Sequence, residues 1–327
     1  MTPSRVRPAV PAPDLVPEKV FDSPWVRPPT LRLNRMSDAA QILRDFKPTR
    51  EFFIGIDSDG CIFDSMEIKH KECFAPMFIK HFELQAVSKY AREVWEFVNL
   101  YSKTRGANRF PALVRALNLL RERPQVKTRG VKVPDTKALD EWIARETKLG
   151  NATLNAEVKN GNNGLEQVKR WSDAVNAQIE DIVKGVPPFP LVRECLDKIN
   201  QKADAMCISQ TPAEALKREW AEHGIDKFVK IIAGQEMGTK TEHLKFAEVG
   251  KYTPEKILMI GDAPGDFSAA KKDGALFFPV NPGNEEASWQ RLHEEGLDRF
   301  FAGAYAGDYE TALVKEFDAC LPEKPSW

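Results

Sequence analysis

A short apolar run followed at once by two closely spaced aspartates constrains this chain more than any other segment. The apolar residues 52–56 predict a buried strand, and Asp57, Asp59 and Gly60 come directly after it. Because Asp and Gly are poor strand formers, we expect the strand to end at Asp57. Open α/β sheets bind ligands at the carboxyl ends of their strands. Two carboxylates there can divide the roles of nucleophile and proton donor if a divalent cation screens their repulsion.

The second half of the chain alternates between strand-like apolar runs and helical stretches. Strands are expected at 204–209, 228–233, 256–261 and 275–280, with helices at about 190–202, 212–223, 241–250 and 265–273. This alternation indicates right-handed βαβ units and a parallel sheet, which the strand before Asp57 is expected to join. We therefore predict an α/β fold with a Rossmann-like, doubly wound parallel sheet as its core.

Residues 66–185 have a different character, because apolar residues recur there at helical spacing, as at Val94 and Val98. Helices are expected at about 66–82, 87–103, 109–122, 135–147 and 164–184. We predict an all-α subdomain at 66–185, inserted into a core formed by 36–65 and 186–327.

Prolines dominate the amino-terminal segment, residues 1–35. Eight of them lie within the first 30 residues, and proline is excluded from helix interiors and central strands. We predict an extended or disordered arm, followed by a short helix that begins with a capping residue near 36–43.

The composition is that of a globular protein without a strong charge bias. The formal net charge is −1, which argues against a nucleic-acid partner. The five cysteines are scattered and form no CxxC pair, which favours reduced thiols and a cytoplasmic location. No apolar run reaches the roughly 20 residues that span a bilayer, and no apolar signal core is seen, so no membrane partner is expected. The oligomeric state is left open.

A serine ends the strand expected at 204–209. Ser209 is followed by Gln210 and Thr211, and Thr211 has the spacing of a capping box with Glu214. A hydroxyl just before exposed helix amides is a natural cradle for phosphate. A capped helix without a ligand is the alternative interpretation.

A second pair of acids follows the strand expected at 256–261. Asp262 and Asp266 offer clustered carboxylate oxygens, which suit Mg²⁺, although they also fit the capping of a helix. Lys240 lies at the start of a helix between the strand that ends at Ser209 and the strand that ends before Asp262. From there its amine is able to bind both Asp57 and a phosphate. Lys245 competes with Lys240 for this role.

Taken in chain order, these segments resemble the haloacid dehalogenase superfamily. The four motifs of that family are matched by Asp57 with Asp59, by Ser209, by Lys240, and by Asp262 with Asp266. The resemblance covers about residues 50–65 and 186–285. The inserted helices match the family in type and position only.

The resemblance implies a mechanism. Asp57 is expected to attack phosphorus and form an aspartyl-phosphate, while Asp59 protonates the leaving oxygen and later deprotonates water. Mg²⁺ is expected on Asp57, the backbone carbonyl of Asp59, Asp262 and Asp266. Ser209, Gln210 and Lys240 are expected to bind the phosphate of a small phosphorylated substrate. An acid at position 59 favours a phosphate ester over the substrates of dehalogenating or phosphonate-cleaving relatives.

The helical insert is expected to act as a cap that closes over the site and contacts the part of the substrate that is not phosphate. Its loop 102–110 concentrates cations and an amide. Arg105, Asn108 and Arg109 are candidates for gripping an anionic or polyhydroxyl leaving group. A solvated turn is the alternative.

Three functions compete. The leading one is a Mg²⁺-dependent phosphatase acting on a small phosphorylated metabolite. A phosphomutase of the β-phosphoglucomutase type would pass the phosphoryl group to a second hydroxyl instead. A catalytically silent binding protein of the same fold is the third, although the intact acid pairs speak against it.

Overall fold

The computed structural model describes residues 39–248 and 250–327, so the arm predicted for residues 1–35 lies outside the described residues. Five parallel strands form one sheet in the order β3-β2-β1-β4-β5. They are β1 (Phe52–Ile56), β2 (Ala203–Ile208), β3 (Ile231–Ala233), β4 (Ile257–Gly261) and β5 (Leu276–Pro279). The predicted α/β fold is confirmed.

The central strand β1 is buried along its whole length. Its last residue, Ile56, is paired with Cys207 of β2 and with Ile260 of β4. The three central strands therefore end almost level with one another. This register brings the residues that follow them to one edge of the sheet, as the sequence predicts for parallel strands.

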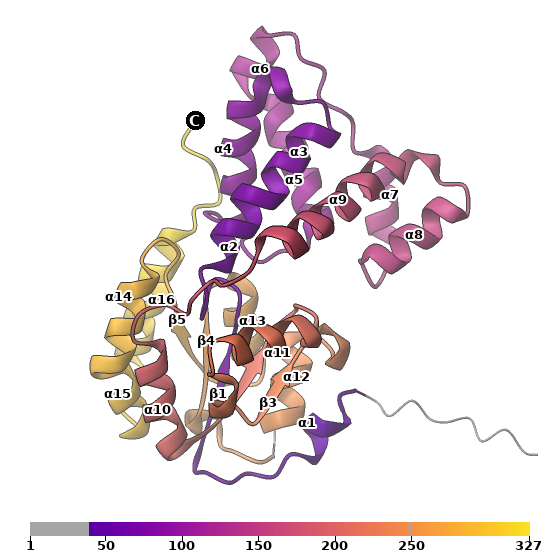
Figure 1. The fold of residues 1–327 in the computed structure, drawn as a ribbon. Helices are drawn as coiled ribbons and strands as arrows, with labels where there is room; N and C mark the ends of the chain where they lie inside the picture. The colour runs from indigo at the N-terminus through magenta and orange to yellow at the C-terminus, as the bar shows by residue number, and fades with distance from the viewer. Residues whose placement is uncertain (1–38, 249) are drawn as a thin grey trace, which may run out of the picture. The chain divides into compact units, whose positions relative to one another are not determined.

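Helices cover both faces of the sheet (Figure 1), because alternate side chains of β1 enter two separate apolar clusters. One face packs against α10 (Val192–Lys202), α11 (Ala213–Glu222), α14 (Glu285–Arg291) and α15 (Leu297–Phe301). The other packs against α1 (Gln41–Asp45), α12 (Lys240–Glu248) and α13 (Pro264–Lys272), and α16 (Asp308–Cys320) lies beside β5.

The inserted segment forms its own helical bundle with its own apolar cluster, and we call this bundle the cap. It comprises α2 (Ser65–Ile68), a π-helical stretch (Lys69–Phe74), α3 (Ala75–His81), α4 (Ser88–Asn99), α5 (Arg109–Glu122), α6 (Pro124–Thr128), α7 (Lys137–Arg145), α8 (Asn151–Lys159) and α9 (Glu166–Ile182). Trp95, Trp142 and Trp171 are fully buried there, and Trp220 is fully buried in the core. The domain boundaries themselves stay a prediction.

The sequence missed some helices. α6, α8 and the helices after β5 were not predicted. The helix expected near 36–43 begins outside the described residues, and α1 ends two residues later than expected, at Asp45. Only Leu154 of α8 is buried, so this helix lacks the apolar periodicity that marks the others.

Among the described residues, no helix combines the length and the apolar character that crossing a bilayer requires.

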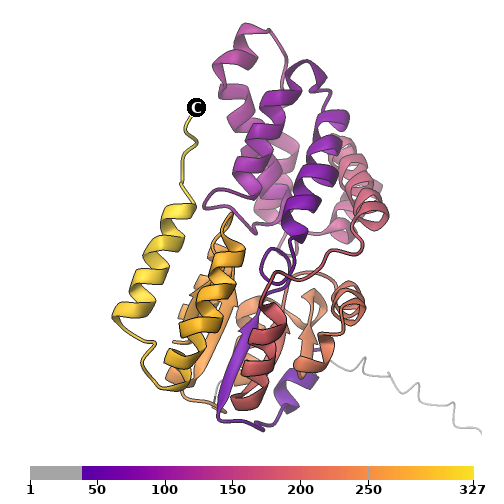
Figure 2. The ribbon, with the colours of Figure 1, turned by 60° about the vertical axis from the view of Figure 1, so that its left-hand side comes forward.

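The segment after α16 returns to the cap, as the yellow trace in Figure 2 shows. Arg115 of α5 donates a 2.6 Å hydrogen bond to the carbonyl of Glu323, and the rings of Phe97 and Trp327 lie 5.4 Å apart. Lys103 forms an ion pair with Asp318 of α16. The core and the cap are therefore joined at the loop between α4 and α5 as well as through the chain.

Candidate active site

Asp57 lies at the end of β1 and is almost completely buried. Its backbone N–H continues the sheet by donating to the carbonyl of Ile260 at 3.0 Å. One carboxylate oxygen accepts from the N–H of Ser58 at 2.8 Å, and the other lies 2.6 Å from Nζ of Lys240. Burial raises the pKa of Asp57 to about 7, although the charge of Lys240 acts in the opposite direction.

Lys240, the first residue of α12, bridges two carboxylates. Its Nζ lies 2.6 Å from Asp57 and 2.6 Å from Asp266. Burial disfavours the charged amine, but Asp266 and Asp57 outweigh burial and raise the pKa of Lys240. Lys245, the competing candidate, is exposed. The structure thus places Lys240, and not Lys245, against Asp57.

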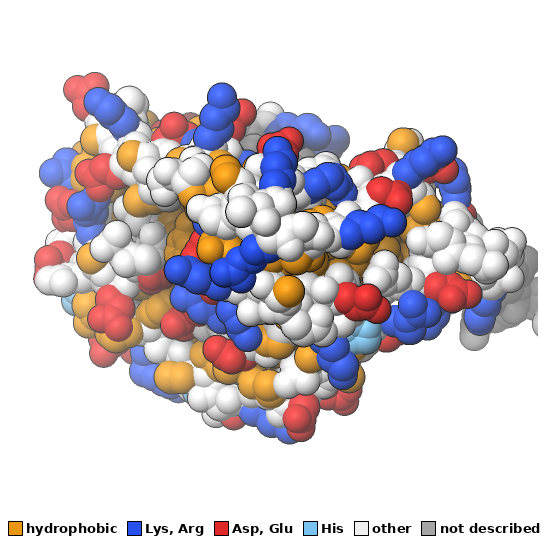
Figure 3. Space-filling model, turned by 90° about the horizontal axis from the view of Figure 1, so that it is seen from above, with side chains coloured by type: hydrophobic (Ala, Val, Ile, Leu, Met, Phe, Trp, Pro, Cys, Tyr) orange, Lys and Arg blue, Asp and Glu red, His pale blue; other side chains and the backbone are white. Residues whose placement is uncertain are grey.

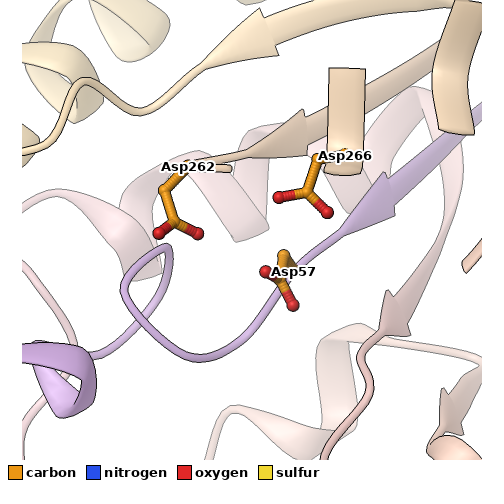
Figure 4. A group of neighbouring side chains, drawn as sticks. All are labelled: Asp57, Asp262 and Asp266. Atoms are coloured by element: carbon orange, nitrogen blue, oxygen red, sulfur yellow. The ribbon is translucent and has the colours of Figure 1, made fainter. Parts of the chain in front are cut away.

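Asp57, Asp262 and Asp266 form a compact acidic cluster whose carboxylates face a common space (Figure 4). One oxygen from each lies within 4.8 Å of the others. Asp262 follows β4, and Asp266 is held in the first turn of α13, where it accepts from the N–H of Ala263 at 3.1 Å. Burial raises the pKa of Asp262 to about 6 and also raises that of Asp266. The cluster therefore concentrates negative charge away from solvent.

This cluster fits a small divalent cation. Oδ1 of Asp262 is buried and has no hydrogen-bond partner among the described residues. An unpaired buried carboxylate oxygen is costly, and hard cations such as Mg²⁺ bind carboxylate oxygens. The donor set is therefore able to hold the expected metal.

An arginine of the cap covers the other oxygen of Asp262. Arg105, in the loop between α4 and α5, lies with Nε and Nη2 each 2.7 Å from Oδ2 of Asp262, and both side chains are about 2% exposed. Its Nη1 donates to the carbonyl of Leu100 at 3.0 Å. The cap and the acidic cluster are thus joined by a buried ion pair.

Gly60 allows this ion pair to form. Its φ of +76° lies in the left-handed region, which glycine adopts readily. A Cβ at this position would lie 2.6 Å from Nη2 of Arg105 and 2.6 Å from Oδ2 of Asp262. Glycine is therefore needed here for both backbone conformation and space.

Asp59 faces hydroxyls and a cation from both the core and the cap. One oxygen accepts from Ser65 and from Lys69, and the other accepts from the Thr211 hydroxyl at 2.7 Å. Burial alone would raise the pKa of Asp59, but Lys69 and the hydroxyl donors lower it to about 2. Asp59 is therefore ionised in this state of the protein.

The capping box predicted for Thr211 and Glu214 is wrong. The Thr211 hydroxyl donates to Asp59. The N-cap residue of α11 is Pro212, and its side chain makes no capping hydrogen bond. The N–H of Ala213 instead donates to Glu236 at 3.0 Å. The charge of Asp59, distant in sequence, outcompetes the local pattern because a hydrogen bond to a carboxylate is stronger than one to a neutral group.

The remaining phosphate-binding candidates lie after β2. Ser209 is 2% exposed, and its Oγ accepts from the N–H of Thr211 at 3.2 Å. Gln210 is exposed, and its amide donates to the carbonyl of Gly238 at 3.0 Å. Ser209 is thus held at the edge where Asp57 lies, while Gln210 faces away into a backbone contact.

Sequence reasoning missed Lys69 and Thr211 as neighbours of Asp59. The spacing of Ser65 and Lys69 was an available signal, because residues four apart lie on one face of a helix. Both side chains reach the same oxygen of Asp59. For Thr211 the capping pattern hid the contact.

The cap candidates separate by their partners. Arg105 binds Asp262, as described above. Asn108 is the N-cap of α5, accepting from the N–H of Phe110 at 3.0 Å and donating to the carbonyl of Leu149 at 3.2 Å. Arg109 donates to Ser172 at 3.1 Å and to Asn176 at 2.7 Å. Neither Asn108 nor Arg109 has an acidic partner among the described residues.

A cavity of about 670 Å³ lies beside α11 and the end of α9. Its lining includes Ser65, Glu219 and His223, together with residues 183–186 that join the cap to the core. Because Ser65 hydrogen-bonds Asp59, the cavity ends one side chain away from this carboxylate.

Similar solved structures differ greatly from this chain in sequence. A predicted phosphoglycolate phosphatase from Haemophilus somnus is 15% identical, covers 71% of this chain and 86% of its own, and gives a TM-score of 0.42. A haloacid dehalogenase-like family hydrolase from Streptococcus pneumoniae is 14% identical over 75% of this chain and 91% of its own, with a TM-score of 0.38. A subfamily IA hydrolase of the same superfamily from Geobacter sulfurreducens is 14% identical over 71% and 88%, with a TM-score of 0.37. A search of curated proteins finds no match.

A family model matches part of the chain. The model described as haloacid dehalogenase-like hydrolase matches residues 125–280. The matched region contains Ser209, Lys240, Asp262 and Asp266, and it begins after Asp57 and Asp59. This match confirms the resemblance expected from the motifs, because residues 125–280 are similar to the haloacid dehalogenase-like hydrolases.

Proposed function

We propose that this protein is a Mg²⁺-dependent phosphatase that hydrolyses a small phosphorylated metabolite through an aspartyl-phosphate on Asp57. The main support for this proposal is the environment of the Asp57 carboxylate. It is a buried carboxylate at a strand end, held by Lys240 and clustered with Asp262 and Asp266, and Oδ1 of Asp262 has no hydrogen-bond partner among the described residues. The family match to a group of hydrolases supports it.

In this proposal Asp57 is the nucleophile, and other residues bind the phosphate. Lys240 contacts one oxygen of Asp57 and lies where it is able to neutralise a bound phosphate dianion. Ser209 accepts a hydrogen bond from Thr211, which leaves its hydroxyl proton free for a phosphate oxygen. Gln210 contributes only if it leaves the carbonyl of Gly238.

Asp59 serves as the acid and then the base. Its low pKa suits the base step directly, since the carboxylate is ready to accept a proton from water. The acid step needs a protonated carboxyl group, and therefore a higher pKa of Asp59. A phosphate dianion bound beside Asp59 raises this pKa, because a nearby like charge disfavours ionisation. Any release of Lys69 from Asp59 during cap movement acts in the same direction.

The acidic cluster would hold Mg²⁺ through Asp57, Asp262 and Asp266, with the backbone carbonyl of Asp59 as a further ligand. When bound, the ion supplies charge neutralisation for the phosphoryl oxygens. The chain itself holds Asp262 in place through Arg105, and it leaves Oδ1 of Asp262 free.

Replacing Asp57 with Asn tests the proposal. The variant is expected to lose hydrolysis of p-nitrophenyl phosphate, and EDTA is expected to abolish it in the wild type. Asp64→Asn is the matched control, because Asp64 is exposed and lies in the same segment. Wild-type activity in Asp57→Asn eliminates the nucleophile assignment.

The same assay separates the alternatives. Rapid turnover to free phosphate excludes a phosphomutase, whereas a long-lived aspartyl-phosphate that passes to a second hydroxyl favours one. The absence of both turnover and phosphorylation on a broad panel of phosphate esters would favour the silent binding protein.

A further inference from the structure

Arg109, the first residue of α5, is a partly buried cation that has no acidic partner within residues 39–248 and 250–327. Its Nη1 donates only to the neutral groups of Ser172 and Asn176, and its guanidinium lies 5.1 Å from the ring centre of Phe74. Burial lowers the pKa of Arg109 to about 10, so it remains charged at neutral pH. A desolvated charge without a counter-ion is costly unless something pairs with it.

Arg109 is connected to two of the contacts that the cap makes with the acidic edge. Four residues before Arg109 in the chain, Arg105 binds Asp262. The ring of Phe74, which contacts the guanidinium of Arg109, stacks on His70 at 4.7 Å. Lys69, the residue before His70, binds Asp59. A chain of side-chain contacts therefore links Arg109 to the segment of the cap that binds Asp59.

His70 adds a neutral donor to this surface. Its Nδ1 accepts from the indole N–H of Trp95 at 3.2 Å, which places the imidazole proton on Nε2. Burial and then the nearby cations, Arg105 first, lower the pKa of His70 to about 3. His70 is therefore a neutral side chain that is held in place and has one N–H to donate.

Among the cap candidates, only Arg109 remains available for a ligand anion. Arg105 is neutralised by Asp262, and Asn108 is used by the backbone at Phe110 and Leu149. Lys69 is neutralised by Asp59. A neutral polyhydroxyl group would leave the guanidinium of Arg109 without a counter-charge.

We propose that Arg109, with His70 beside it, binds a second anionic group of the substrate while the first phosphate is bound at Asp57. The substrate class is then a small phosphate monoester that also carries a carboxylate or a second phosphate. This inference rests on the proposed phosphatase function.

The test compares esters that differ only in this second charge. 3-Phosphoglycerate carries a carboxylate where glycerol 3-phosphate carries a hydroxymethyl group, and glycerol 1,3-bisphosphate carries a second phosphate. For the wild type, kcat/KM of at least one anionic ester is expected to exceed that of glycerol 3-phosphate by about 10- to 100-fold. A gain of this size is what one hydrogen bond between charged groups contributes. The better of the two identifies the anion.

Arg109→Gln is expected to abolish this preference, because it lowers kcat/KM for the anionic esters far more than for glycerol 3-phosphate. Arg121→Gln is the matched control, because Arg121 lies at the other end of α5 and also bonds neutral groups, Asn118 and Pro134. It is expected to keep the full preference. Arg109→Lys, which keeps the charge, is expected to restore part of it.

The outcomes distinguish the two proposals. Equal kcat/KM values for all three esters in an active wild type would overturn the subsite and leave the phosphatase standing, even if Arg109→Gln does not fold. Suppose instead that no ester is hydrolysed with Mg²⁺ present. Binding is then measured by calorimetry. If 3-phosphoglycerate or the bisphosphate binds about tenfold more tightly than glycerol 3-phosphate, and Arg109→Gln loses this difference in affinity, the result would support the subsite alone. Equal binding of all three would overturn it.

Discussion

Replacing Lys240 with methionine is expected to destabilise the metal-free protein strongly. Methionine keeps the length of the side chain and removes the charge. Lys240 contacts Asp57 and Asp266 at 2.6 Å, and its side chain is 17% exposed while theirs are 6% and 0%. Without the lysine these carboxyls face Asp262 with no cation between them. Breaking a buried ion pair by removing one partner costs about 3–5 kcal/mol.

The loss is expected to depend on pH in a definite direction. In the wild type the pKa of Asp57 is already raised from 3.8 to about 7, and removing Lys240 raises it further. Above pH 7 the wild-type carboxyl is ionised, while the folded variant still holds a proton that its unfolded chain releases. The penalty therefore grows by about 1.4 kcal/mol for each pH unit above 7. At pH 6, where Asp57 is protonated in both proteins, it is smaller.

Urea denaturation followed by circular dichroism at pH 6 and pH 8.5, in EDTA, measures these free energies of unfolding. Lys245→Met is the control for loss of a lysine from the same helix, and it is expected to change stability by less than about 0.5 kcal/mol. Mg²⁺ is expected to restore part of the stability of Lys240→Met by binding the carboxylates that the lysine no longer neutralises. A loss below about 1 kcal/mol at pH 8.5, or a loss no larger than that of Lys245→Met, would refute the reasoning.

Three further predictions concern the scaffold. Asp204 is buried at the start of β2 and accepts from Thr49 N–H at 2.6 Å, so Asp204→Asn is expected to lower the free energy of unfolding by about 2–3 kcal/mol; a urea midpoint equal to that of the exposed Asp226→Asn would contradict this. Gly60→Ala is expected to lower Tm more than Gly130→Ala. Both glycines have positive φ, but of the two only Gly60 has side chains where a Cβ would lie. Equal Tm shifts would argue against a steric clash at position 60. Burial and then the charge of Lys240 lower the pKa of His243 to about 4, so the contribution of His243 to the free energy of unfolding is expected to fall by about 3 kcal/mol between pH 6.5 and pH 4 as the unfolded chain takes up the proton. His243→Leu is expected to lack this part of the slope, and identical urea-derived slopes would count against it.

The position of the acids could be read from the sequence because it depends on local patterns. An apolar run that stops at Asp57 and another that stops before Asp262 define strand ends without reference to the rest of the fold. Parallel pairing then requires these ends to meet, as the pairing of Ile56 with Ile260 shows. Ser209 follows β2 for the same reason.

The partners of those acids could not be read in this way. Thr211 lies 152 positions from Asp59, and Arg105 lies 157 positions from Asp262. Whether each side chain meets a carboxylate depends on where α11 and the loop between α4 and α5 pack. Local spacing predicted a helix cap for Thr211, and the cations of loop 102–110 suggested Arg105 as a substrate contact. In the structure each binds a carboxylate that is distant in sequence. The substrate contact of Arg105 stays a prediction.

The sequence by itself therefore determined the sheet, the strand ends and the set of acidic and basic residues at one edge. Only the tertiary structure decided which charges are paired and which are left without a partner. The physical reason is that strand ends follow from short-range backbone preferences, whereas the pairing of buried charges follows from desolvation by parts of the chain that are far apart in sequence. Among the described residues, this packing leaves Arg109 without an acidic partner and Oδ1 of Asp262 without a hydrogen bond.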